Sequence, residues 1–114
     1  MRSYDIALIP GDGIGKEVVE AAMPVLRKAA GQNGFTLKET VYSWSCNVYL
    51  ETGRMMPEDG VEQLRRHDSI LLGAVGWPDR VPDSVSLHGL LLPIRKAFDL
   101  YVNMRPHRML PGVT

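Results

Sequence analysis

Short apolar runs alternate along this chain with segments of helical periodicity, and this alternation restricts its possible folds more than any other feature. Residues 6–9 form an uninterrupted apolar run, whereas apolar side chains recur every three or four positions across residues 14–30. An uninterrupted run is typical of a strand covered on both faces, as in a parallel sheet. A period near 3.6 is typical of a helix with one face on a core. The chain is therefore predicted to begin with a strand followed by a helix.

The same alternation continues through the rest of the chain. Residues 35–42 alternate imperfectly and predict a strand near a sheet edge, and residues 70–75 are the clearest candidate for a buried strand. The other expected elements are helices at residues 45–52, 57–67 and 87–98 and an extended last strand at residues 101–110. This order predicts an α/β fold with a mainly parallel sheet and flanking helices.

Charge balance and cysteine content exclude several classes of protein. The 114 residues hold 13 Lys+Arg and 13 Asp+Glu, so no basic surplus supports binding to nucleic acid or to an anionic membrane surface. Cys46 is the only cysteine, which excludes an internal disulfide and a cysteine-built metal site. The N-terminus does not resemble a signal peptide, and no apolar run approaches the roughly 20 residues of a membrane span. We therefore expect one cytoplasmic domain without a nucleic-acid or membrane partner.

Two glycine-rich turns follow predicted strands. Pro10-Gly11-Asp12-Gly13-Ile14-Gly15 precedes the first helix, and Gly73-Ala74-Val75-Gly76 ends the third strand. Glycines let the backbone approach a ligand, and open α/β sheets bind ligands beyond the carboxyl ends of their strands. The G-x-G-x-G spacing is not the dinucleotide fingerprint, and the Lys16-Glu17 pair lacks the hydroxyl of a P-loop. Each turn therefore has two open interpretations: a ligand loop, or close packing of helix against strand.

A third group consists of Arg95 and Arg105, with His88 nearby in the sequence. Two guanidinium groups on adjacent elements could hold a small polycarboxylate through paired hydrogen bonds. The alternative is a solvated helix face, which is the ordinary place for a pair such as Arg95-Lys96. Position in the sequence does not decide between them.

Three motifs in a fixed order resemble the isocitrate/isopropylmalate dehydrogenase family of β-decarboxylating dehydrogenases. They are the stretches Ile9-Pro10-Gly11-Asp12-Gly13-Ile14-Gly15-Lys16-Glu17-Val18, Leu72-Gly73-Ala74-Val75-Gly76 and Leu91-Leu92-Pro93-Ile94-Arg95 continuing to Arg105-Pro106. Within the family, residues 53–60 and 77–91 are most similar to the tartrate and D-malate dehydrogenase branch. His88 departs from that branch, where tryptophan is usual.

The resemblance implies an NAD-dependent oxidation of a 2-hydroxy acid, tartrate or D-malate, assisted by Mg²⁺ or Mn²⁺ and followed by decarboxylation where a carboxylate is beta to the new ketone. An isopropylmalate dehydrogenase-like member is an alternative. By motif match, Arg95 and Arg105 would hold substrate carboxylates, and Leu91 would set side-chain specificity. The residues implied for the cofactor are Ile14, Gly73, Ala74, Val75, His88 and Gly89.

The resemblance also implies that residues 1–114 are the N-terminal part of the family's large domain. The family's catalytic tyrosine and lysine and its metal-binding aspartates lie further along a longer chain, so no catalytic residue or metal ligand is expected in this segment. The full-length parent is expected to be a homodimer. The alternative function is a catalytically inactive remnant that acts as an interaction module.

Overall fold

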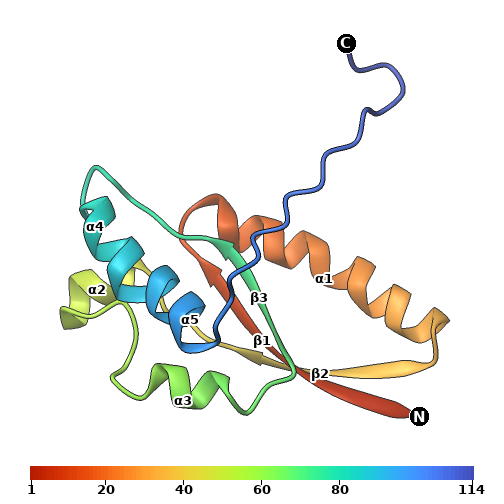
Figure 1. Ribbon diagram of the computed structural model, residues 1–114, viewed down its shortest axis with the longest axis horizontal. Helices are drawn as coiled ribbons and strands as arrows, with labels where there is room; N and C mark the ends of the chain where they lie inside the picture. Colours follow the sequence, from red (N-terminus) through yellow and green to blue (C-terminus); the bar gives the residue numbers. More distant parts are fainter.

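The computed structural model describes all 114 residues and contains a three-stranded parallel sheet (Figure 1). The strands are β1 (Arg2–Gly11), β2 (Phe35–Val41) and β3 (Ser69–Ala74), in the spatial order β2-β1-β3. Helices flank the sheet, which confirms the predicted α/β class and parallel pairing. The edge position predicted for the second strand is also confirmed.

Helices cover both faces of the sheet. The single long helix α1 (Ile14–Gln32) lies on one face, and all the shorter helices lie on the other (Figure 1). The shorter helices are α2 (Cys46–Thr52), α3 (Gly60–Leu64), α4 (Asp83–Ser86), the wide π-helical turn η1 (Leu87–Leu91) and α5 (Leu92–Ala97).

The central strand β1 supplies side chains to two separate cores. Ile6 and Leu8 pack with Val19 and Met23 of α1, whereas Ala7 and Ile9 join the larger cluster under the short helices. Successive side chains of a strand point to opposite faces, so a strand between two helical layers must be apolar at every position. This is the physical reason why residues 6–9 form an uninterrupted apolar run.

Local signals set the ends of α2. The Ser45 hydroxyl accepts a hydrogen bond from the Val48 N–H at 3.4 Å, and Gly53 ends the helix in the left-handed conformation with a φ of 80°. The predicted short helix is thus confirmed almost to its boundaries. The helix expected at residues 57–67 is wrong in length, since only Gly60–Leu64 is α-helical and turns replace both ends.

The last helical segment runs from Asp83 to Ala97, starting four residues before the predicted position. Its middle is the π turn η1, in which the Leu92 N–H donates to the Leu87 carbonyl five residues earlier. Pro93 follows directly, and a proline ring clashes with the carbonyl four residues before it in a regular α-helix. Widening the preceding turn lets the helix continue into α5 despite this proline.

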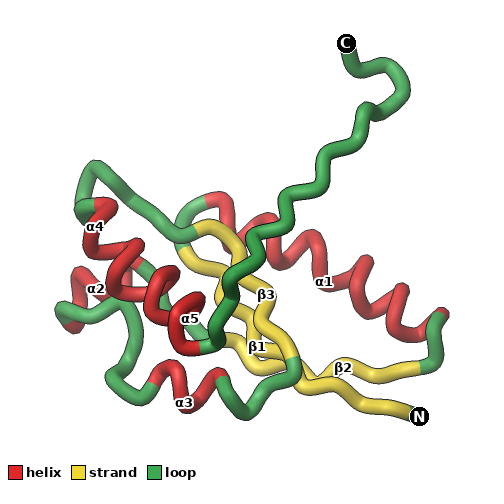
Figure 2. The backbone as a smooth tube through the Cα atoms, in the orientation of Figure 1, coloured by secondary structure: helices red, strands yellow, loops and turns green.

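One strand prediction is confirmed only in part, and another is wrong. The strand expected at residues 70–75 is present as β3, but it is half-buried, because it lies at a sheet edge while β1 occupies the centre. Residues 101–110 are extended but form no strand (Figure 2). They pair with no neighbour and every side chain there is exposed. Extended backbone becomes a strand only where it pairs, and Pro106 has no N–H to donate.

No helix in the structure has the length and apolar character needed to cross a membrane.

We expect the 114-residue chain to self-associate as its concentration rises. Val102 is 64% exposed and Met104 is 79% exposed on the extended segment, and β3 separately has a free edge. Exposed apolar side chains and unpaired strand edges are association sites. Light scattering should therefore report a mass that increases with concentration. The double variant Val102→Glu, Met104→Lys should reduce this increase, and a constant monomer mass for the unsubstituted chain would contradict the prediction.

Candidate functional site

The two glycine turns lie against each other at the carboxyl ends of β1 and β3. The Asp12 N–H donates to the Ala74 carbonyl at 2.6 Å, and β1 pairs with β3 up to the match of Gly11 with Ala74. The chain crosses from β2 over β1 to reach β3, so this junction is a point where the winding direction reverses. Such reversal points are where ligands of open α/β sheets bind.

Three of the glycines at this junction are required for packing. A Cβ on Gly11 or Gly15 would overlap backbone atoms of Ala74 or Pro10, and a Cβ on Gly73 would overlap the Pro10 carbonyl. Gly11 also has a φ of 80°, which a larger residue rarely adopts. Close packing, one of the two interpretations left open by the sequence, therefore explains why these three positions are glycine.

Gly13 and Ile14 remain free to face a ligand. A Cβ on Gly13 would meet no atom within 4 Å, and Ile14 is 66% exposed. No side chain caps this end of α1, although the first turn of a helix has N–H groups without intrahelical partners. The junction thus combines packed glycines beneath with an uncapped helix end and an apolar side chain at the surface.

Asp12 is a buried charge that the sequence analysis did not single out. It is 5% exposed, and its carboxylate accepts hydrogen bonds from the backbone N–H groups of Cys46 and Gly76 at 3.0–3.2 Å. A buried carboxylate needs such donors. The available signal was an acidic residue between two glycines, in a turn expected to pack against another strand end.

Cys46 is fully buried beside this carboxylate. Burial is the largest cause, and together with the hydrogen bond and the charge of Asp12 it raises the pKa of the Cys46 thiol from an ordinary value of 9.0 to about 11, while the N–H groups of Trp77 and Gly76 oppose the shift. The thiol therefore stays protonated in the folded protein and can donate to Asp12.

This shift predicts a loss of stability at alkaline pH. Above pH 9.0 the Cys46 thiol of the unfolded chain ionises, whereas the folded chain keeps its proton until about pH 11. The unfolded state then binds fewer protons, so the free energy of unfolding falls across this window, by roughly 2–3 kcal/mol in total. The free energies of unfolding in urea of the native chain and of Cys46→Ala should therefore become more similar as the pH rises. A difference that is constant with pH would contradict this assignment.

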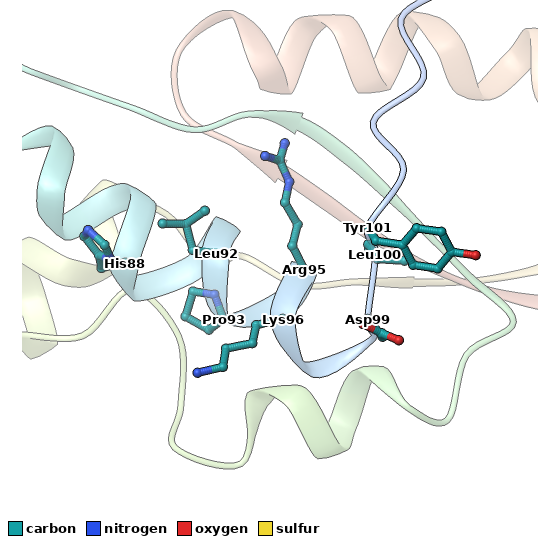
Figure 3. Close-up of a pocket in the computed structure, with 8 residues that line it drawn as sticks. All are labelled: His88, Leu92, Pro93, Arg95, Lys96, Asp99, Leu100 and Tyr101. Atoms are coloured by element: carbon teal, nitrogen blue, oxygen red, sulfur yellow. The ribbon is translucent and has the colours of Figure 1, made fainter.

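A second group of predicted residues lies on η1 and α5. His88 and Arg95 line an open cavity of about 670 Å³ (Figure 3). Leu91 and Arg95 also line a smaller cavity of about 130 Å³ against Ile70 and Leu72 of β3. The structure therefore brings three of the predicted site residues together, with Arg95 shared by both cavities. Arg95 and Lys96 extend to opposite sides of α5 in Figure 3.

The larger cavity carries an excess of positive charge. Arg95 and Lys96 are the basic residues of the lining, and Asp99 is its acidic residue. Asp99 ends α5 with a positive φ of 53°, which turns the chain so that Leu100 lies over the smaller cavity. A lining of this kind favours an anionic ligand.

Two predicted residues do not join these groups. A Cβ on Gly89 would meet the Met55 side chain at 2.8 Å, so Gly89 faces the core. Arg105 is exposed on the extended segment, which leaves the body of the molecule after α5 (Figure 1). The paired clamp expected from Arg95 and Arg105 is not assembled in this structure.

β3 connects the junction of the glycine turns to the cavities on α5. Leu72 faces the smaller cavity, and the next residue, Gly73, faces Gly15 and α1 on the opposite face of the sheet. The exposed surface at Gly13 and Ile14 could hold part of a polar cofactor. No group of three or more His, Cys, Asp or Glu side chains is placed to hold a metal ion.

Comparison with known proteins shows the family of this chain. The sequence model of the isocitrate/isopropylmalate dehydrogenase family matches residues 5–114. The tartrate dehydrogenase/decarboxylase of Pseudomonas putida is 53% identical over 113 residues, which cover 98% of this chain and 31% of that protein. The decarboxylating D-malate dehydrogenase of Escherichia coli strain K12 is 54% identical over 114 residues, which cover 99% of this chain and 32% of that protein.

A probable tartrate dehydrogenase/decarboxylase of Bacillus subtilis strain 168 is 51% identical over 115 aligned positions and is covered to 32% of its length. The chain thus spans about a third of the length of the curated relatives that it matches. The family match extends over nearly the whole chain and includes both glycine turns and the Arg95 segment, so the chain belongs to the isocitrate/isopropylmalate dehydrogenase family.

Proposed function

We propose that this chain supplies the N-terminal part of the large domain of an NAD-dependent oxidoreductase that oxidises, and can decarboxylate, a small 2-hydroxy dicarboxylate. Tartrate and D-malate are the proposed substrates, since the relatives named for these activities are 47–54% identical. The observation that carries the proposal is that Arg95 lines two cavities, a larger one with His88 and Lys96 and a smaller one with Leu91 against β3.

Arg95 is the residue proposed to bind a substrate carboxylate. Its guanidinium group can donate two parallel hydrogen bonds, which fixes the orientation of a planar carboxylate as well as neutralising its charge. Leu91 lies one helical turn away against β3 and would contact the substrate side chain. Arg105 would complete the clamp only if the extended segment moved toward α5, and this movement is part of the proposal.

The nicotinamide half of NAD is proposed to bind at the junction of the glycine turns. Bound NAD would supply the hydride acceptor. The residues proposed to orient it are Ile14, Gly73, Ala74 and Val75, with His88 of η1 approaching from the side of the substrate cavity. Support comes from the exposed Ile14 side chain and the uncapped N-terminus of α1, which leave room and N–H donors for a polar ring substituent.

The proposal also includes a divalent metal, Mg²⁺ or Mn²⁺, and a homodimer in the complete protein. The residues of this stretch do not form a metal site. The ligands would have to come from sequence corresponding to the remaining two thirds of the relatives, as would the catalytic acid and base.

A chimera tests the proposed function. Residues 1–114 would replace the matching stretch of the Escherichia coli D-malate dehydrogenase, and a second chimera would use the Pseudomonas putida protein. We expect NADH to form with D-malate or tartrate in the presence of Mg²⁺ or Mn²⁺, and not without the hydroxy acid. Two chimeras that melt like their parents but never reduce NAD would contradict the proposal and support the alternative of an inactive interaction module.

A further inference from the structure

Asp12 contacts the turn after β3 on both sides of Val75. Its backbone N–H donates to the Ala74 carbonyl at 2.6 Å, and its carboxylate oxygen Oδ2 accepts from the Gly76 N–H at 3.2 Å. One residue therefore fixes the main chain immediately before and immediately after Val75. Gly11 adds a steric limit, since its missing Cβ would lie 2.9 Å from the Val75 Cγ2.

The same carboxylate is held from a third direction by the start of α2. The Cys46 N–H donates to Oδ1 at 3.0 Å and to Oδ2 at 3.1 Å. Asp12 is 34 positions from Cys46 and 64 positions from Gly76 in the sequence. Its carboxylate therefore joins three segments that the chain brings together only in the folded state.

Burial makes the Asp12 carboxylate depend on the N–H groups that donate to it. Asp12 is 5% exposed, so its charge is removed from water and depends on the N–H groups that point at it. A buried acceptor that loses one donor regains no water in its place. Movement of the turn at residues 74–76 would therefore break hydrogen bonds to a buried charge.

We infer that Asp12 is a positioning residue: it holds the turn at residues 73–76 in the position that the cofactor requires, without contacting the cofactor itself. The inference rests on the proposed function, in which Gly73, Ala74 and Val75 orient the nicotinamide half of NAD. Asp12 of the first glycine turn therefore determines the backbone conformation of the second glycine turn, at residues 73–76.

Amide hydrogen exchange on the 114-residue chain tests the structural half of the inference. Asp12→Ala should accelerate exchange of the Gly76 and Cys46 amides by about 10- to 100-fold, since each loses a hydrogen bond to a charged acceptor. Leu64→Ala, which opens a cavity in the core at α3 without removing a hydrogen bond to the turn, is the matched control for lost stability. Exchange at Gly76 and Cys46 is compared with exchange of amides elsewhere in the sheet. If Leu64→Ala accelerates the Gly76 and Cys46 amides as much as Asp12→Ala does, Asp12 has no local role at the turn.

Asp12→Asn provides a second variant that is closer to the native residue. An asparagine keeps the size and one carbonyl oxygen for the Cys46 N–H, but its other terminal atom can be an NH₂ group that cannot accept from Gly76. We expect faster exchange at Gly76 with little change at Cys46. If neither amide responds to this substitution, the turn does not depend on the Asp12 carboxylate.

Binding of NAD to the D-malate dehydrogenase chimera tests the functional half. Asp12→Asn should raise the Kd and KM for NAD by about tenfold and leave the KM for D-malate within about twofold. Leu64→Ala should change neither constant. Equal NAD affinity with and without the Asp12 carboxylate overturns the positioning role alone. An unsubstituted chimera that does not bind NAD overturns the proposed function, and with it the role of Asp12 toward the cofactor.

Discussion

Gly73→Ala is expected to lower the free energy of unfolding by about 3 kcal/mol or more. The added Cβ would overlap the Pro10 carbonyl and lie 3.0 Å from both the Gly15 carbonyl oxygen and the Val19 Cγ2. Two of these three obstacles are backbone atoms of the neighbouring turn and helix, so no rotamer change can relieve the clash. Gly15→Ala should have an effect of similar size, because its Cβ would overlap the backbone of Pro10 and Ala74. Chemical denaturation followed by circular dichroism measures both changes.

Gly31→Ala is the matched control for these two variants. Gly31 lies in α1, and a Cβ there would meet no atom within 4 Å. Alanine is a better helix former than glycine by about 1 kcal/mol, so this variant should be as stable as the native chain or more stable. If Gly31→Ala destabilises the chain as much as Gly73→Ala does, close packing of the two turns is not the cause.

Arg95→Ala and Arg105→Ala in the D-malate dehydrogenase chimera are each expected to lower kcat/KM by about 10- to 150-fold. A charge-assisted hydrogen bond to a carboxylate contributes roughly 1.5–3 kcal/mol, and its loss appears in kcat/KM if the contact persists in the transition state. Arg95→Lys should not restore activity, because an ammonium group cannot reproduce the paired hydrogen bonds of a guanidinium group. Steady-state NADH formation across D-malate concentrations gives these values.

Arg66→Ala is the control for the two arginines. Arg66 is exposed between α3 and β3, away from both cavities on α5. We expect its kcat/KM to stay within about twofold of the unsubstituted chimera. Arg27 is less suitable, since its guanidinium group makes two 2.7 Å hydrogen bonds to the Glu39 carboxylate and so joins α1 to β2. If Arg95→Ala behaves like Arg66→Ala, Arg95 belongs to a solvated helix face and the proposed substrate site is wrong.

The first half of the fold could be predicted because its boundaries depend on neighbouring residues. The glycine-rich turn at residues 10–13 separates β1 from α1, and Ser45 and Gly53 bound α2 through local hydrogen bonds and backbone conformation. Signals of this kind act over a few residues and can be read directly from the sequence.

Features that depend on distant partners could not be predicted in the same way. β3 has the most apolar sequence, but its burial depends on its place at the edge of the sheet. The role of Asp12 depends on Cys46 and Gly76, far along the chain, and the extended segment lacks the pairing that a strand needs. For the site, the motif resemblance named Arg95, Leu91 and His88, but only the structure shows that Arg95 lines one cavity with His88 and another with Leu91.

The π turn at Leu87–Leu91 also sets the rotational phase of the last helical segment. The core-facing residues there are Ser86, Leu90, Ile94 and Phe98, at intervals of four. In a regular α-helix, four residues advance about 40° beyond a full turn, so three such intervals would rotate Phe98 about 120° away from the direction of Ser86. One additional residue in a wide turn removes about 100° of this drift. A regular α-helical turn at Leu87–Leu91, with no residue removed, would therefore rotate the residues after it by about 100° relative to those before it, and Arg95 could not then keep its place over β3 while Ser86 stayed in the core.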